Sequence, residues 1–200
     1  MGRTAGHNLL HAASSQSPES SSPGAPSIAI LYPVRARLRD GTEIVIRPIG
    51  PEDAEREQAF VRSLSPESRY FRFMNTLREL SPEMLHRFTH PDLQHEVALV
   101  ALVGEGAGMR QIGVARFVAD AEGGGAEFAI VIGDEWHNRG VGSRLMRELM
   151  RSARALGIQR LWGDILATNQ RMLSLMTALG FELHSAPADP LLKRASLSLN

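Results

Sequence analysis

The stretch from 126 to 156 constrains the fold most, because a strand there leads through a short turn into a long helix. Residues 126–132 are apolar apart from Glu127, which predicts a strand, and the continuously apolar run at 97–103 is typical of a strand inside a sheet. From Gly140 to Leu156 the apolar side chains recur at helical spacing on one face, and Gly157 favours the end of that helix. Both elements need a partner for their apolar surface, so the stretch predicts layers of helix packed on sheet.

Turn and cap signals place the other elements. Ser-Pro-Glu occurs at 65–67 and again at 81–83, which is a serine cap followed by a proline in the first helical turn. The other helices are predicted at 51–64, 66–74, 82–89 and 169–179. The other strands are predicted at 34–38, 43–48, 97–103, 112–118, 161–166, 181–184 and 192–199. This order predicts an α/β fold, in which a mixed sheet carries helices on both faces.

Composition limits the class of protein. The 200 residues include 22 basic and 22 acidic side chains and no cysteine. A disulfide framework, a zinc ribbon, an iron–sulfur site and a thiol nucleophile are therefore excluded, and neutrality argues against a nucleic-acid partner. No apolar run approaches the ~20 residues of a membrane span, which indicates no membrane association and favours a cytoplasmic protein. Residues 1–27 are rich in Ser and Pro and predict a disordered tail before one domain at 28–200.

Two glycines at the start of the long helix indicate an anion site. Gly140 and Gly142 let backbone amides approach a ligand closely, and a helix N-terminus attracts negative charge. Arg139 and Arg144 add positive charge beside it. The alternative is a plain strand–helix turn that needs glycine for its geometry. A P-loop is absent, and Leu145 stands where the dinucleotide-binding fingerprint requires its third glycine.

The residues around these glycines carry a resemblance to a known family. Arg139-Gly140-Val141-Gly142-Ser143 resembles the Arg/Gln-x-x-Gly-x-Gly/Ala signature of the GNAT acetyltransferases. Asn169, Met172, Leu175 and Leu179–Phe181 resemble the second block of that family, which ends in Leu-Gly-Phe.

A narrower resemblance points to one subgroup. Leu38–Gly41, Ile46–Ile49, Pro51–Asp53 and Leu64–Phe73 resemble the acetyltransferase domain of bacterial protein lysine acetyltransferases. Those proteins often carry an acyl-CoA synthetase-like half as well. The similarity covers about residues 38–184.

The resemblance implies a single GNAT-type domain with a mostly antiparallel sheet of about six or seven strands. In this family two central strands splay apart, and the arm of acyl-CoA enters the gap. It therefore implies acetyl-CoA as cosubstrate, no metal, and a protein lysine as the acceptor partner. The residues that it assigns to acyl-CoA are Ile130, Val131, Ile132, Asn138, Arg139, Gly140, Val141, Gly142, Ser143, Arg144, Asn169 and Met172. Asn169 also has a rival role as a helix cap.

Glu127 is the candidate catalytic residue. A lysine amine, with an ordinary pKa of ~10.4, must lose a proton before it attacks a thioester, so a general base is useful. Glu127 lies in an otherwise apolar strand, where partial burial would raise its pKa toward neutrality, and relatives of this kind carry a catalytic Glu on this strand. The alternative is a carboxylate that faces water, because Glu127, Ala129 and Val131 share one side of the strand.

One position departs from the family pattern. Many relatives carry a tyrosine seven residues after the asparagine, as the acid that protonates the leaving thiolate, whereas this chain has Met176. This departure keeps one alternative open, a module that senses acyl-CoA without turnover, and it counts against the other alternative, an acetyltransferase for a small amine. Elsewhere, His86 and His90 stand four apart on a predicted helix, a spacing open to metal binding, although a solvent-facing pair is the simpler interpretation. The oligomeric state is left open.

Overall fold

The structure is a computed structural model that describes residues 31–186 and 189–199. The predicted tail at 1–27 and the predicted domain start at Ile28 lie outside the described residues. Among the described residues, no helix is both long enough and apolar enough to span a bilayer.

One eight-stranded sheet forms the centre of the molecule, in the order β1-β2-β3-β4-β5-β6-β8-β7. The strands are β1 (Val34–Arg37), β2 (Glu43–Pro48), β3 (Glu96–Val103), β4 (Arg110–Ala119), β5 (Gly125–Ile132), β6 (Arg160–Leu166), β7 (Glu182–Ser185) and β8 (Leu192–Ser198). Every neighbouring pair is antiparallel except β5 and β6, which are parallel. The mixed, mostly antiparallel sheet is confirmed. All eight strands predicted along the sequence are present, which is one or two more than the six or seven that the family resemblance implied.

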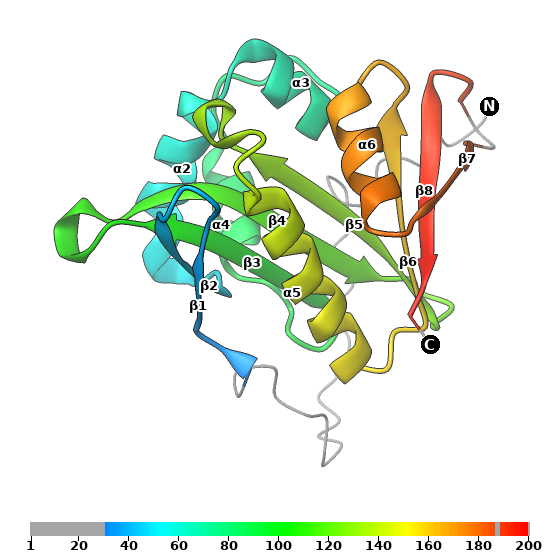
Figure 1. The fold of residues 1–200 in the computed structure, drawn as a ribbon, viewed down its shortest axis with the longest axis horizontal. Coiled ribbons are helices and arrows are strands. Elements are labelled where there is room, and N and C mark those ends of the chain that lie inside the picture. The colour runs from blue at the N-terminus through cyan, green and yellow to red at the C-terminus, as the bar shows by residue number, and fades with distance from the viewer. Residues whose placement is uncertain (1–30, 187–188, 200) are drawn as a thin grey trace.

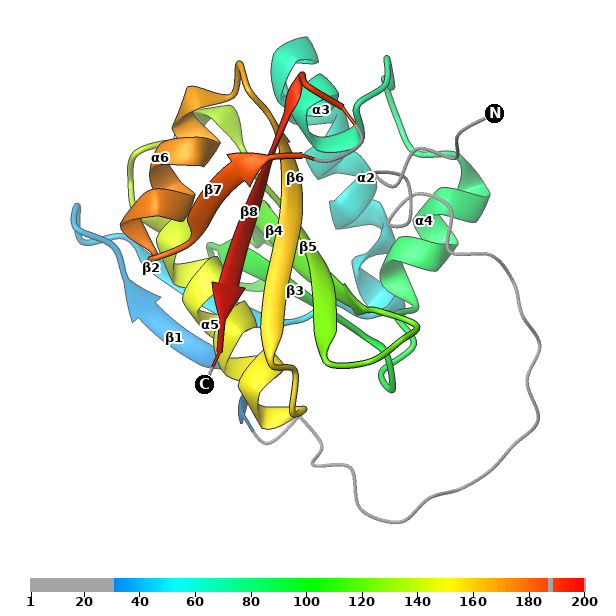
Figure 2. The ribbon, with the colours of Figure 1, turned by 90° about the vertical axis from the view of Figure 1, so that its right-hand side faces the viewer.

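Five α-helices cover the two faces of the sheet. They are α2 (Ala54–Ser63), α3 (Pro66–Phe73), α4 (Pro82–Thr89), α5 (Val141–Ala155) and α6 (Gln170–Ala178). Short 3-10 turns η2 (Pro51–Asp53), η3 (Gly106–Gly108) and η4 (Asp134–Trp136) join elements. Figures 1 and 2 show α5 and α6 on one face and α2 and α4 on the other. The predicted serine caps are confirmed, since Ser65 accepts from the Ser68 amide and Ser81 from the Met84 amide.

The sheet therefore has a core on each side. One core joins α5 and α6 to the sheet and contains Leu145 and Leu149, both fully buried. The other joins α2, α3 and α4 to the opposite face and contains Phe73 and Phe88. Strand β3 is apolar from Val97 onward because both of its faces are buried. Val97, Leu99 and Ala101 lie in the first core, and Ala98, Val100 and Leu102 lie in the second. Burial on both faces thus requires apolar residues at every position.

Strands β5 and β6 pair only at their beginnings. Gly125, Ala126 and Glu127 pair with Arg160, Leu161 and Trp162, and no pairing follows along the remaining residues of either strand. Figure 1 shows the two strands diverging toward α3 and α6. The predicted splay of two central strands is therefore present. On the other side of β5 the ladder with β4 continues to Ile132.

The hydrogen-bond alternation of β5 leaves main-chain groups facing this gap. The Gly133 amide donates to the Ile112 carbonyl at 2.9 Å, which places the odd-numbered residues of β5 in hydrogen-bonded pairs with β4. The amide and carbonyl groups of Phe128, Ile130 and Ile132 consequently point toward the gap. Since the Ile132 carbonyl already lies 3.0 Å from His137 Nε2, a strand-like ligand that enters the gap would find its partners in the Ile130 amide and carbonyl and the Ile132 amide.

Candidate active site

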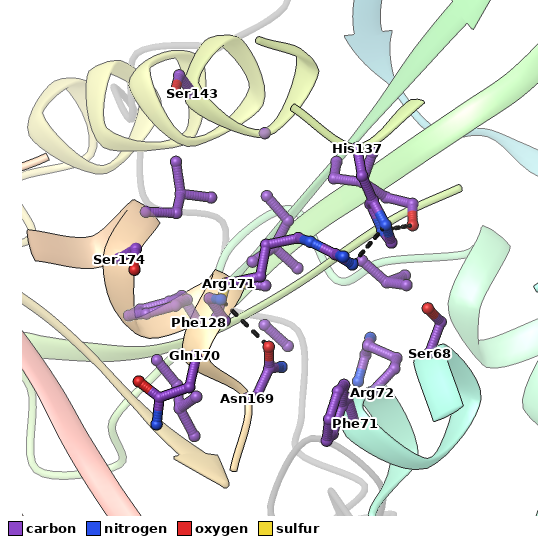
Figure 3. A pocket seen from close by; sticks show the side chains of 18 of the residues that line it. Ser68, Phe71, Arg72, Phe128, His137, Ser143, Asn169, Gln170, Arg171 and Ser174 are labelled. Atoms are coloured by element: carbon purple, nitrogen blue, oxygen red, sulfur yellow. Dashed lines mark hydrogen bonds between the residues drawn. The ribbon is translucent and has the colours of Figure 1, made fainter. Parts of the chain in front are cut away.

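A cavity of about 620 Å³ lies where β5 and β6 separate. The residues of β5 from Glu127 to Ile132 form one wall, and Asp164 and Ile165 of β6 face them. Helix α3 and the N-terminal ends of α5 and α6 complete the lining (Figure 3). From the predicted site, the cavity gathers Glu127, Ile130, Val131, Ile132, Asn138, Gly140, Gly142, Ser143, Asn169 and Met172.

Glu127 lies at the last residue pair before the strands part. Its partners in the sheet are Val118 on β4 and Trp162 on β6. The side chain is 7% exposed, and Oε2 has no hydrogen-bond partner among the described residues. Burial, together with the negative charge of Asp164, raises the pKa of Glu127 to about 7. The alternative of a carboxylate facing open water is therefore wrong, because the second core covers this side of β5.

A fixed ion pair stands beside this carboxyl group. Asp164 of β6 accepts two hydrogen bonds from the Arg194 guanidinium of β8, at 2.8 and 2.7 Å. Arg194 in turn packs over the Trp162 ring, 4.3 Å from its centroid. Asp164 disfavours a negative charge on Glu127 and raises its pKa, whereas Arg194 favours that charge and lowers it.

The start of α5 offers unpaired amides to the cavity. Gly140 precedes the helix with φ of +93°, a conformation that favours glycine, and no side chain caps this end. The Arg144 amide closes the first turn on the Gly140 carbonyl at 3.1 Å, so the amides of Val141, Gly142 and Ser143 have no intrahelical acceptor. These donors and the helix dipole form a site for an anion.

The arginines of the signature lie elsewhere than expected. Arg139 donates from Nε to Asp40 at 2.7 Å and stacks over Trp136, 4.0 Å from the ring centroid. It does not line the cavity, and neither do exposed Arg144 and fully buried Val141. Alignment of the signature on Gly140 and Gly142 puts His137, rather than Arg139, at its first position, three residues before Gly140.

His137 connects the two helices that border the cavity mouth. Its Nδ1 accepts from Arg171 Nη1 at 2.6 Å, and its Nε2 lies 3.0 Å from the Ile132 carbonyl. Arg171 carries only donors, so the proton of His137 is on Nε2, which donates to Ile132. Burial and the adjacent Arg171 lower the pKa of His137, which keeps the ring neutral at pH 7. Figure 3 shows Arg171 reaching from α6 to His137.

Asn169 caps α6 while it lines the cavity. Its Oδ1 accepts from the Met172 amide at 3.1 Å (Figure 3). The capping role is therefore confirmed. The side-chain NH₂ group has no hydrogen-bond partner among the described residues and remains available to a ligand in the cavity.

Helix α3 is held at the cavity by the turn that follows β5. Asp134 of η4 accepts from the Ser65 amide at 2.8 Å and from the Ser68 hydroxyl at 2.7 Å. This contact brings Ser68, Phe71 and Arg72 into the lining. Sequence reasoning missed Arg72, Arg171 and Arg39 as site residues. An arginine near aromatic residues or in a helix is interpreted first as a solvated side chain, and Arg39 lies in the turn between β1 and β2, where the sequence carries no signal of a site.

The histidine pair on α4 forms no metal cluster. The rings of His86 and His90 stack, with 3.9 Å between their centroids, and both side chains are exposed. Across the described ranges, no group of three or more His, Cys, Asp or Glu side chains is placed to hold a metal ion.

Comparisons with known proteins agree on one family. The acetyltransferase (GNAT) domain family matches residues 43–182, well over half of the chain. An acetyltransferase of Pseudomonas aeruginosa is 39% identical over 152 residues, which are 76% of this chain and 82% of that protein. The acetyltransferase Pat of Mycolicibacterium smegmatis is 32% identical over 153 residues, 76% of this chain but only 45% of its own length.

The solved structures give the same result. The crystal structure of the GNAT domain of S. lividans PAT has a TM-score of 0.76 and 30% identity, and the match covers 83% of this chain and 96% of that domain. A cAMP-binding acyltransferase from Mycobacterium smegmatis has a TM-score of 0.57 and 28% identity, with 88% of this chain and 50% of that one covered. The chain spans about half of that larger protein. On the family match and the 39% identical relative, this chain belongs to the GNAT acetyltransferases and is an enzyme of acyl transfer.

Proposed function

We propose that the chain moves an acetyl group from acetyl-CoA to a protein lysine, with Glu127 as the general base. The observation that carries this proposal is the buried Glu127 at the point where β5 and β6 part. A carboxyl group with a pKa of about 7 and an unpartnered oxygen holds and releases a proton at working pH.

The residues of the cavity fit acetyl-CoA. The gap-facing main-chain groups of Ile130 and the Ile132 amide suit an arm that carries amides, because they would pair with it as with a neighbouring strand. The open amides at the start of α5 suit its pyrophosphate. Asn169 offers a side-chain amide beside the arm. When bound, acetyl-CoA supplies an acetyl group activated as a thioester.

The chemistry follows from Glu127. Its carboxylate takes a proton from the ammonium group of the acceptor, and the neutral amine attacks the thioester carbon. A C–N bond forms, the C–S bond breaks, and the thiolate leaves with the electron pair. Met176, at the position of the family's tyrosine, is fully buried in the core and has no proton to give. Solvent therefore takes the second proton of the attacking nitrogen and protonates the thiolate, which gives a neutral amide and a free thiol.

The acceptor is tested with a panel. The relatives include the acetyltransferase Pat of Mycolicibacterium smegmatis and the GNAT domain of S. lividans PAT, and the subgroup resemblance favours a protein lysine. Incubation with labelled acetyl-CoA, lysine peptides, polyamines and free amines is expected to label the peptides and to release free thiol. Preferential labelling of polyamines would replace the protein acceptor with a small amine. Tight acetyl-CoA binding without thiol release for any acceptor would support a sensing module instead.

A valine at Gly142 is expected to weaken acetyl-CoA binding by about tenfold or more, roughly 1.4 kcal/mol. A Cβ at this glycine would lie 3.0 Å from Leu175 Cδ2 and 3.6 Å from Ile132 Cγ1, so the two branches of valine crowd the cavity beside the proposed phosphate site. Isothermal titration calorimetry gives the Kd. Arg147→Val, on the exposed face of the same helix, is the control for a β-branched residue. Equal Kd values for wild type and Gly142→Val would contradict this placement.

A further inference from the structure

Arg72 is a cationic side chain in the wall of the cavity that has no acidic partner within ion-pair distance among the described residues. It lies on α3 and faces the α6 residues Asn169 and Arg171 across the pocket (Figure 3). Among the described residues it makes no hydrogen bond and no ion pair; its guanidinium rests over Phe73, 5.1 Å from the ring centroid. Burial and the nearby Arg116 lower the pKa of Arg72 to about 10, so the side chain remains charged at neutral pH.

The acidic side chains near Arg72 are already engaged elsewhere. Glu57 accepts a short hydrogen bond from Gln111, and Glu96 accepts from Arg116 at 2.8 Å. Asp164 is held by Arg194. Among the described residues, Glu127 is therefore the free carboxyl group of the cavity wall, and two guanidiniums there have no hydrogen bond or ion pair: Arg39, which is exposed, and Arg72, which lies closer to Glu127 in charge interaction.

Glu127 and Arg72 belong to the same side of the sheet. Val131, which shares a face of β5 with Glu127, packs in the core that contains Phe73, the residue next to Arg72. The open end of α5, where the phosphates of the cosubstrate are proposed to bind, belongs to the helix on the opposite face. The amine that Glu127 deprotonates must approach from the face of Glu127. Arg72 therefore lies on the side of the cavity where the acceptor approaches, and not on the side of the nucleotide.

We propose that Arg72 binds a carboxylate of the acceptor, so that preferred substrates carry an acidic group close to the reacting amine. The proposal rests on the proposed function, in which Glu127 receives the proton of that amine. The planar guanidinium suits a carboxylate, which it binds through two parallel hydrogen bonds. For a protein acceptor, the acidic group is an Asp or Glu beside the acetylated lysine. For a small acceptor, it is the α-carboxylate of an amino acid.

Two matched acceptor pairs test this assignment. The first is a peptide with Asp-Lys against the same peptide with Asn-Lys, and the second is lysine against cadaverine, which lacks only the carboxylate. Thiol release gives kcat/KM for each. The wild type is expected to favour the acidic member by roughly tenfold or more, as for a charge-assisted hydrogen bond. In Arg72→Gln this ratio is expected to fall to about one, whatever the absolute rate.

Two further variants separate recognition from structure. Arg62→Gln, an exposed arginine of α2 that pairs with Glu79, is expected to keep the wild-type ratio. Arg72→Lys keeps a positive charge but loses the two parallel donors of the guanidinium. It is therefore expected to keep part of the kcat/KM preference for the acidic acceptor. A ratio that is the same in wild type and Arg72→Gln, or an enzyme that turns over neither acidic acceptor, overturns the proposal.

The outcomes also distinguish this proposal from the proposed function. Turnover of peptides without preference for Asp would overturn the role of Arg72 and leave the protein-lysine proposal standing. An Arg72-dependent preference for lysine over cadaverine, with no turnover of peptides, would support Arg72 and contradict the protein acceptor.

Discussion

Glu127→Gln is expected to lower kcat by about 10²–10⁴-fold, the range that general base catalysis contributes. Glutamine keeps the size and leaves the cavity wall in place but has no site for the proton. The Kd for acetyl-CoA is therefore expected to stay at the wild-type value. Steady-state kinetics with an acceptor identified in the panel, together with calorimetry, measures both quantities.

The pH profile gives this prediction a second readout. Because the pKa of Glu127 is about 7, log kcat/KM of the wild type is expected to rise by about one per pH unit below 7 and to flatten above it. Glu127→Gln is expected to rise steadily past pH 7 instead, because only the neutral fraction of an amine with a pKa of ~10.4 then reacts. Two profiles of the same shape would remove Glu127 from the role of base.

Stability supplies the control for this variant. The folded state raises the pKa of Glu127 above its unfolded value of about 4.3, so the folded protein holds that proton more tightly. Between these two values the folded state loses stability as pH rises. Glutamine does not ionise, so Glu127→Gln is expected to unfold at the same free energy or a higher one at pH 8. A large loss of stability would mean that lower activity reports unfolding instead of lost base catalysis.

Asp53→Ala is expected to lower the free energy of unfolding by about 3 kcal/mol, the low end of the range for breaking a buried ion pair. The Asp53 carboxylate is fully buried and accepts from Arg47 at 2.6 and 2.7 Å, from the Gly50 amide at 3.0 Å and from Arg56 at 3.0 Å. These contacts tie the end of β2 to the start of α2. The low end applies because both arginines are partly exposed.

Urea unfolding of Asp53→Ala and a matched variant checks this value. Glu43→Ala removes the partner of Arg37 from an exposed pair, in which both side chains are 71% exposed, and is expected to have no measurable effect. Equal losses for the two variants would contradict the prediction.

The wild type and Asp53→Ala are also expected to differ in how much stability they lose at acidic pH. Burial acts to raise the pKa of Asp53, but hydrogen bonds from Arg47 and Gly50 outweigh it and hold the pKa below its ordinary value. This group therefore contributes stability above its unfolded pKa of about 3.9, and the contribution is lost as pH falls through the lower folded pKa. Asp53→Ala is expected to lack that part of the acid-induced loss.

Local chemistry made much of the fold predictable. Ser65 and Ser81 cap helices where the Ser-Pro-Glu repeats predict them, and the apolar period from Val141 onward matches the buried face of α5. Capping and periodicity depend on residues within one turn of each other, so they are visible in a single sequence. All eight strands were predicted as well, including β1 and β7, the four-residue strands at the two edges of the sheet.

The candidate site was predictable only in part, for a related reason. The positions of Gly140, Gly142 and Asn169 at predicted helix starts made them candidates, and the structure places all three at the cavity. Arg139 carried the same local signal, yet it pairs with Asp40, a residue 99 positions away. Arg72 and Arg171 had no such signal, because their place in the lining depends on how α3 and α6 pack.

The sequence by itself determined the helices, the strands, the glycines at the start of α5 and the presence of a carboxyl group in β5. Only the tertiary structure decided that β5 and β6 pair over three residues and then part, since the two strands are joined by α5 and held apart by the elements around the cavity. It also decided that Glu127 is buried with a pKa of about 7, and that Arg72 shares its side of the sheet. These properties depend on contacts with residues that are distant in the chain, and the propensities of a short segment do not predict such contacts.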